Sequence, residues 1–196
     1  MKLESPVFDN NQPYPTIYTQ DGDNISPPLH WSNAPAGTKC FVLIMENSED
    51  YSTHWLLYNL PSMMTALDRE VPDGGHYGSQ AFQGVNDFGT VGYCGPEMSD
   101  DPSSFIFRLY AMDSELPLKE GCSKAELLSA MEGHIMAQAD LKTSYSRKAP
   151  GQFAMELRLE RQHKDAYDLS AQNNKIQPED ARYDQSDEKL PIKKRG

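Results

Sequence analysis

A single histidine stands where this sequence could bind a ligand. His54 follows the polar, acidic stretch at residues 46–51 and precedes the apolar run at residues 55–58. A polar loop between two strand-like segments is a natural place for a small-molecule site, and a protonated imidazole donates hydrogen bonds to phosphate or carboxylate oxygens. From the residues alone, a half-buried histidine that only bonds its own loop is the simpler interpretation.

The carboxylates beside this histidine raise the question of a metal ion. Glu46, Glu49 and Asp50 join His54 in offering ligands that several ions accept. Their spacing fixes no coordination geometry, and acidic loop residues usually face water. Three cysteines complete the set of candidate ligands: Cys40, Cys94 and Cys122. They lie far apart without a CxxC pair, so we predict no metal site and no cofactor, and expect small buried thiols in a reducing compartment.

Two serines raise the question of nucleophilic catalysis. Ser103 and Ser104 open a strongly apolar segment, and a Ser–His pair with His54 is one known route to a covalent intermediate. The sequence contains no Gly-x-Ser-x-Gly elbow. Turn serines at the entrance of a strand are the simpler interpretation, so we predict no catalytic residue and do not expect an enzyme; a weak hydrolase is the least favoured alternative.

The charge of the chain is unevenly distributed. The net charge is −11 over 196 residues; residues 1–147 carry 8 Lys and Arg against 20 Asp and Glu, and residues 148–196 carry 10 against 9. The excess of negative charge in residues 1–147 argues against broad binding to nucleic acid or to an anionic membrane surface, although it is compatible with one local anion pocket. Because no run of 18 apolar residues and no apolar leader is present, we expect a cytoplasmic protein without a membrane span, unless a leader was removed beforehand.

Short extended segments separated by turn signals dominate the first 120 residues. Apolar runs at residues 41–45, 55–58 and 105–112 predict strands, with the middle run buried on both faces, and residues 7–8 and 17–18 are weaker strand candidates. Four glycines and a proline at residues 84–96 exclude a helix there. The pattern indicates an all-β sandwich with a peripheral helix.

Two further elements are expected in the second half. Ser123 and Glu126 form a capping-box pattern ahead of an apolar stripe, which predicts a helix over residues 124–142. Alternating apolar residues at 153–159 predict a half-buried edge strand. Hydrophobic residues make up only 38% of the chain and the mean hydropathy is −0.68, so part of it is expected to lie outside the core.

Several blocks taken together resemble the phosphatidylethanolamine-binding proteins, also called Raf kinase inhibitor-like proteins, and most of all the bacterial branch. The blocks are Asp-Gly-Asp-Asn-Ile-Ser-Pro-Pro-Leu at 21–29, His-Trp at 54–55 with Asn-Leu-Pro at 59–61, Gly-Val-Asn-Asp-Phe-Gly at 84–89, Gly-Tyr-Cys-Gly-Pro at 92–96, and Phe-Arg-Leu-Tyr-Ala-Met-Asp-Ser-Glu-Leu at 107–116. Their order and spacing over roughly residues 3–147 make the resemblance specific. It implies a mainly β, Greek-key-like sandwich with one or two peripheral helices.

The resemblance also implies a small anion pocket at one end of the sandwich. The ligand-binding residues it implies here are His54, Asn47, Glu49, Gly95, Pro96, Ser103, Ser104 and Phe105. The chain departs from the family twice at this pocket. It reads Asn-Ser-Glu-Asp-Tyr at 47–51 where the family has Asp-Pro-Asp-Ala-Pro, and Ser-Ser-Phe at 103–105 where the family has His-Arg-Tyr. Serine hydroxyls donate more weakly than charged groups, so the anion affinity is expected to be lower or the ligand different.

The function implied is that of a regulatory protein that binds a small anionic ligand, a phosphate or carboxylate head group, and resembles kinase or protease inhibitors. The alternative is a protein-interaction scaffold whose pocket is vestigial. A protein partner and a homodimer are both compatible with the sequence, whereas nucleic acid and a membrane span are not expected.

Two parts of the chain are distinguished by composition. Residues 1–160 are expected to form the sandwich domain, and residues 161–196 a polar C-terminal extension. Lys193, Lys194 and Arg195 end the extension, and their charge favours packing on the acidic core or on a second subunit. A disordered tail at 172–196 is the competing expectation.

Overall fold

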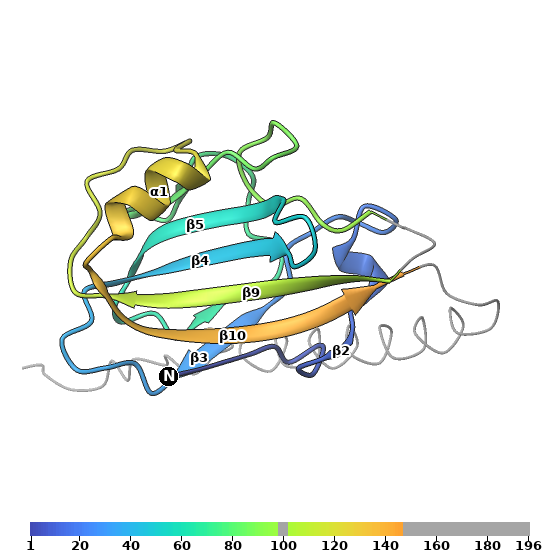
Figure 1. The fold of residues 1–196 in the computed structure, drawn as a ribbon, viewed down its shortest axis with the longest axis horizontal. Coiled ribbons are helices and arrows are strands. Elements are labelled where there is room, and N and C mark those ends of the chain that lie inside the picture. Colours follow the sequence, from blue (N-terminus) through green and yellow to red (C-terminus); the bar gives the residue numbers. More distant parts are fainter. Residues whose placement is uncertain (98–101, 147–196) are drawn as a thin grey trace, which may run out of the picture. The chain divides into compact units, whose positions relative to one another are not determined.

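A computed structural model of the protein describes residues 1–97 and 102–146 (Figure 1). These residues fall within the first of two compact units, Met1–Phe153; the second unit, Ala154–Gly196, lies outside the described residues. So do the strand predicted at 153–159 and the extension at 161–196. Within the described ranges, no helix is long and apolar enough to cross a membrane.

Strands form nearly all of the described secondary structure. In chain order the elements are β1 (Lys2–Glu4), β2 (Gln12–Pro13), the 3-10 helix η1 (Thr16–Tyr18), β3 (Leu29–Ser32), β4 (Cys40–Asn47), β5 (Thr53–Pro61), β6 (Ala66–Leu67), β7 (His76–Tyr77), β8 (Ala81–Gln83), β9 (Ser103–Met112), the helix α1 (Lys124–Met131) and β10 (Ile135–Tyr145). The predicted β-sandwich with a peripheral helix is confirmed. The short strands predicted at residues 7–8 and 17–18 are wrong, because residues 7–8 form a bend and coil and residues 16–18 form η1.

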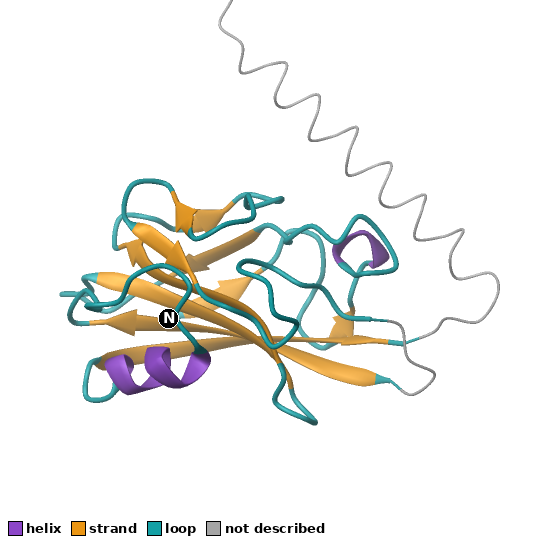
Figure 2. Ribbon diagram, turned by 90° about the horizontal axis from the view of Figure 1, so that it is seen from above, coloured by secondary structure: helices purple, strands orange, loops and turns teal. Residues whose placement is uncertain are grey.

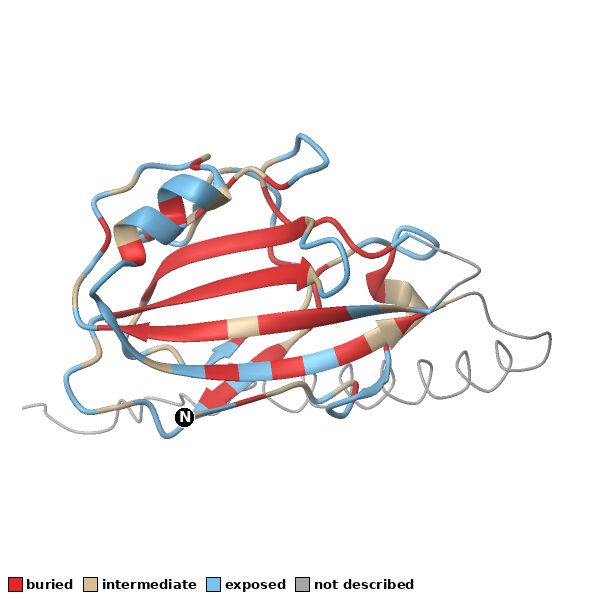
Figure 3. Ribbon diagram, viewed as in Figure 1, coloured by how far each residue is buried: buried red, intermediate tan, exposed pale blue. Residues whose placement is uncertain are grey.

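The strands make two sheets. A small sheet has the order β1-β3-β6, and a large sheet has the order β2-β10-β9-β4-β5-β8-β7. At the centre of the large sheet, β4 and β5 are buried almost throughout (Figure 3). Continuous apolar runs of this kind are typical of strands covered on both faces, as the sequence predicted for residues 55–58.

Each face of the large sheet packs against a different layer. One face shares a core with the small sheet, in which Trp31 meets Phe41 with ring centroids 5.4 Å apart. The other face packs against α1 through Leu127 and Met131 (Figure 2). Because successive side chains of a strand point to opposite faces, β4 contributes Leu43 to the first core and Val42 to the second.

The helix predicted at residues 124–142 is correct only in its first half. The predicted capping box at Ser123 and Glu126 is present, but α1 ends at Met131 and residues 135–145 form β10. Gly133 adopts a φ of +79°, a left-handed conformation that suits glycine near the end of a helix. The buried residues of β10 alternate: Ala139, Leu141, Thr143 and Tyr145. Pairing with β9 along the length of this segment fixes it as a strand.

Candidate functional site at His54

A β-bulge places His54 at the start of β5. The antiparallel pairing joins Met45 to Trp55 and Glu46 to Thr53, so β5 holds one more residue than β4 between these two pairs. That extra residue is His54. A bulge bends the strand and re-aims the side chain, and bulges are common next to functional sites. Here the bulge brings the imidazole against Phe105 of β9, at a centroid distance of 5.1 Å.

Two hydrogen bonds to Cys94 fix the orientation of the imidazole. The N–H of Cys94 donates to the His54 carbonyl at 2.9 Å, and the His54 Nδ1 lies 2.7 Å from the Cys94 carbonyl oxygen. A carbonyl only accepts, so Nδ1 must carry a proton. In the neutral ring Nε2 therefore holds the lone pair, and protonation converts Nε2 into a donor.

The surroundings of His54 favour its neutral form. The residue is 3% exposed, and burial lowers its pKa below the ordinary value. The hydrogen bond to Cys94 and the negative charges of Asp50 and Asp87 oppose part of that shift in pKa. The neutral imidazole therefore lies near carboxylates whose negative charge would stabilise the ring once it is protonated.

The loop after β4 is closed by its own side chains. The Oδ1 of Asn47 accepts the N–H of Glu49 at 2.7 Å, and the carboxylate of Asp50 accepts the N–H of Ser52 at 2.8 Å. The carboxylate of Glu49 in turn accepts the N–H of Ser104 at 3.0 Å. Asn47 and Glu49, both predicted as ligand-binding residues, therefore hold the loop in place and tie it to β9.

The remaining predicted residues take two kinds of position. The carbonyl of Ser104 accepts the N–H of Ser48 at 2.8 Å, so main-chain bonds of β9 hold this loop. The N–H of Gly95 donates to Asn24 at 2.8 Å, and the carbonyl of Pro96 accepts the N–H of Gln20 at 2.9 Å. A Cβ at position 95 would collide with the Tyr18 carbonyl oxygen, so glycine permits this close approach. The structure thus places Gly95 and Pro96 between His54 and the segment after η1.

A buried ion cluster stands behind the same loop. The side chain of Glu46 is 4% exposed and bonds Arg108 of β9 at 2.5 Å and Lys124 of α1 at 2.6 Å. Lys124 also donates to the carbonyl of Tyr51 at 3.0 Å. Both cations near the loop are thereby engaged, and among the described residues no group of three or more His, Cys, Asp or Glu is arranged to hold a metal ion.

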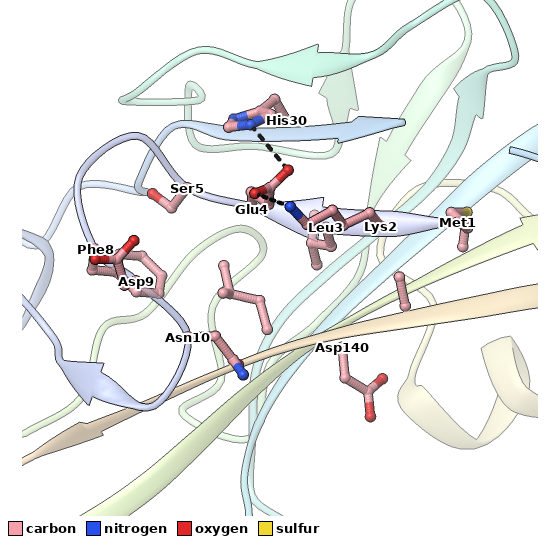
Figure 4. Close-up of a pocket in the computed structure, with 12 residues that line it drawn as sticks. Met1, Lys2, Leu3, Glu4, Ser5, Phe8, Asp9, Asn10, His30 and Asp140 are labelled. Atoms are coloured by element: carbon pink, nitrogen blue, oxygen red, sulfur yellow. Dashed lines mark ion pairs between the residues drawn. The ribbon is translucent and has the colours of Figure 1, made fainter. Parts of the chain in front are cut away.

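A cavity of about 420 Å³ lies elsewhere, between β1, residues 8–10 and β10 (Figure 4). Its walls include apolar side chains such as Phe8 and an ion pair between Lys2 and Glu4 at 2.6 Å, which His30 approaches at 3.7 Å. None of the predicted ligand-binding residues lines it. The cavity is therefore separate from the His54 site.

Comparison with known proteins places the chain in a family. The family model described as phosphatidylethanolamine-binding protein matches residues 4–146. The chain belongs to this family. A UPF0098 protein of Methanothermobacter thermautotrophicus is 41% identical over 150 residues, which is 75% of this chain and 99% of that protein. A UPF0098 protein of Aquifex aeolicus is 37% identical, over 75% of this chain and 89% of its own length.

Solved structures of phosphatidylethanolamine-binding protein relatives agree in fold. A putative homologue from Chlamydia trachomatis superposes with a TM-score of 0.67 at 37% identity, over 75% of this chain and 97% of that chain. The E. coli protein YbcL, described as a new member of the mammalian family, gives a TM-score of 0.69 at 26% identity, over 75% and 98%. The part of the chain shared with the family therefore ends close to β10.

Three residues at the site were missed by sequence reasoning. The ring of Phe88 lies 4.8 Å from that of His54. Cys94 bonds both the main-chain carbonyl and the Nδ1 of His54, and the carboxylate of Asp87 accepts the N–H of Thr53 at 2.7 Å. The blocks at residues 84–89 and 92–96 carried the resemblance to phosphatidylethanolamine-binding proteins. That signal placed these residues in the family pattern without assigning them contacts.

Proposed function

We propose that this member of the phosphatidylethanolamine-binding family is a regulatory, non-enzymatic protein that binds a small anion, a phosphate or carboxylate head group, at His54. The observation that carries the proposal is the fixed imidazole. Because Cys94 occupies Nδ1, Nε2 is the ring nitrogen that would meet a ligand. A buried base held by a main-chain carbonyl at one nitrogen has a fixed orientation, which suits it to receive a ligand oxygen.

Proton uptake accompanies anion binding under this proposal. In the neutral ring Nε2 is an acceptor, so it donates to an anion only after protonation. Since burial lowers the pKa of His54, the protonated ring is a minor species at neutral pH, and the anion selects it. Affinity should therefore fall by about tenfold for each pH unit above the pKa of the free site.

Titration of the full-length chain with inorganic phosphate, followed through the His54 ring signals by NMR, tests the proposal. We expect a saturable shift in the millimolar range that is stronger at pH 6 than at pH 8. The variant His54→Gln should lose the response, and His134→Gln should keep it, because His134 bonds Asp113 on another part of the molecule. If the His54 ring signals do not shift with phosphate at either pH, the proposal is overturned.

The scaffold alternative is favoured by one observation. Arg108 and Lys124 are both bonded to Glu46, which leaves the site without a free cation among the described residues around it. If His54→Gln leaves phosphate binding unchanged, the anion does not bind at His54, and the scaffold alternative with a vestigial pocket is favoured. For the hydrolase alternative, by contrast, no hydrogen bond joins His54 to a serine within the described part of the chain, and its test is ester turnover that His54→Gln abolishes.

A further inference from the structure

Two exposed aromatic side chains lie on separate loops beside His54: the Phe88 ring is 4.8 Å from the His54 ring, and Tyr51 lies two residues before Thr53. Tyr51 is 65% exposed and Phe88 is 47% exposed. The two loops meet at the first residue of β5, where Asp87 both donates its N–H to the Thr53 carbonyl at 3.0 Å and accepts the Thr53 N–H at 2.7 Å. Aromatic residues gathered at one place on a surface are typical of the centres of protein interfaces.

The loop that carries Tyr51 is held in a strained conformation. Tyr51 has a φ of +62°, and the left-handed region costs a residue other than glycine on the order of 1 kcal/mol. Its N–H donates to the Asn47 carbonyl at 3.1 Å, and its carbonyl accepts Lys124 Nζ at 3.0 Å. Local strain that the surrounding structure maintains is concentrated at functional positions.

The loop that carries Phe88 is equally well fixed. The Oδ1 of Asn86 accepts the N–H of Phe88 at 3.0 Å and that of Thr90 at 3.1 Å. Asn86 is itself 2% exposed, so the bonds are shielded from water. Because both rings are presented by ordered loops, a partner would not have to order them on binding.

The two loops also carry exposed carboxylates. Glu49, Asp50 and Asp87 are all exposed on these same loops. Within residues 1–97 and 102–146, the nearby cations Arg108 and Lys124 do not balance them, because both are bonded to the buried Glu46. The surface is therefore aromatic and acidic, which attracts basic side chains and disfavours an anionic bilayer.

We propose that Tyr51, Phe88 and the carboxylates of Glu49, Asp50 and Asp87 form a docking surface for a protein segment that alternates basic and apolar residues. Apolar side chains of the segment would pack on the rings, and its lysine or arginine side chains would pair with the carboxylates and stack on the aromatic faces. The surface goes beyond the anion site, because its contacts are made by the two loops and do not require Nε2 of His54.

A pair of synthetic peptides provides the probe. One alternates Leu and Lys and the other alternates Leu and Glu, both acetylated and amidated, and each is titrated into the full-length chain while backbone amide shifts are recorded. The lysine peptide should shift amides at residues 47–53 and 86–90 and bind more weakly as salt is raised. The glutamate peptide and phosphatidylglycerol vesicles should give no shifts there.

Variants then locate the surface. Tyr51→Asn removes the ring but suits the left-handed backbone, so it should fold normally and raise the Kd of the lysine peptide about tenfold. Phe88→Ala should have an effect of the same size. Met63→Ser is the matched control, since Met63 is 87% exposed at the other end of β5.

The outcomes separate this inference from the proposed anion binding. Tyr51→Asn should raise the Kd of the lysine peptide while the phosphate response of the His54 ring is kept, whereas His54→Gln abolishes the phosphate response. Equal binding of both peptides, shifts centred away from the two loops, or a Kd unaffected by Tyr51→Asn would each overturn the docking surface. Stronger binding to the vesicles than to the lysine peptide would indicate that the docking surface binds a membrane, and it would overturn the proposed peptide docking as well.

Discussion

Two ionisable groups are buried near the same end of the large sheet, and their surroundings differ. Glu46 meets two cations, Arg108 and Lys124, from two other elements. His54 meets a main-chain carbonyl at Nδ1 and two aromatic rings. The two groups are also close along the sheet: His54 lies between Thr53, which pairs with Glu46, and Trp55, which pairs with Met45.

The difference distinguishes a group whose charge the protein itself balances from a group that we propose binds a ligand. Glu46 has its charge matched by the protein itself, which is what a buried carboxylate requires. His54 is buried as a neutral base, and under the proposed function its Nε2 meets the ligand. The loop at residues 47–51 depends on Glu46, because Lys124 links Glu46 to the carbonyl of Tyr51.

The largest expected effect breaks the Glu46 cluster. Arg108→Met leaves a carboxylate that is 4% exposed with one cation fewer, so the free energy of unfolding should fall by about 3 kcal/mol, as measured by urea denaturation. Arg108→Lys should lose much less, because it keeps the charge.

A double variant tests whether the loss comes from the stranded charge. Glu46→Leu combined with Arg108→Met removes both partners, and it should recover most of the stability. Lys124, at 25% side-chain exposure, keeps its hydrogen bond to the carbonyl of Tyr51. If the double variant is as unstable as Arg108→Met alone, packing rather than charge accounts for the loss.

A smaller effect is expected on the His54 side. Asn86 accepts two N–H groups and donates to Thr90 and Gly92 from a buried position. Asn86→Ala should lower the free energy of unfolding by about 2 kcal/mol and free Phe88 from its place against His54. Loss of nuclear Overhauser effects between the Phe88 and His54 rings in NMR spectra would report that release. Asn86→Asp keeps the acceptor oxygen, so its free energy of unfolding should lie between those of the parent chain and Asn86→Ala. An unchanged Phe88 environment in Asn86→Ala would show that packing alone holds the ring.

The fold could be predicted because its signals are redundant. The apolar runs of β4 and β5 and the turn residues between strands agree on a sandwich, and the blocks at residues 21–29 and 84–96 agree on the family. The second half of the predicted helix was wrong because Ala139 and Leu141 fit both a helical stripe and an alternating strand. Pairing with β9, a contact between distant residues, decides the conformation.

The site was harder to predict because its main determinants are not local. His54 could be named from its position before the apolar run. The bulge that orients it arises from the register between β4 and β5, and its bonding partner, Cys94, lies 40 residues away. From the sequence around residues 46–51, all the carboxylates looked free. In the structure Glu46 is buried and paired, with cations that come from β9 and α1.

The smallest expected effect concerns pH, and it sharpens the comparison. An unfolded chain protonates this histidine near its ordinary pKa of about 6.5, whereas burial lowers the pKa of His54 in the folded chain. Below that ordinary pKa the unfolded state therefore binds more protons, and the free energy of unfolding falls as the pH drops toward the folded pKa. In His54→Gln this part of the pH dependence should disappear between pH 7 and pH 5, and His30→Gln, at an exposed position, serves as the control.

Adding phosphate should restore stability to the parent chain at the acidic end of this range, because the anion binds the protonated folded state. If phosphate stabilises His54→Gln to the same extent, the anion binds elsewhere, and the contrast between a satisfied Glu46 and an available His54 does not hold.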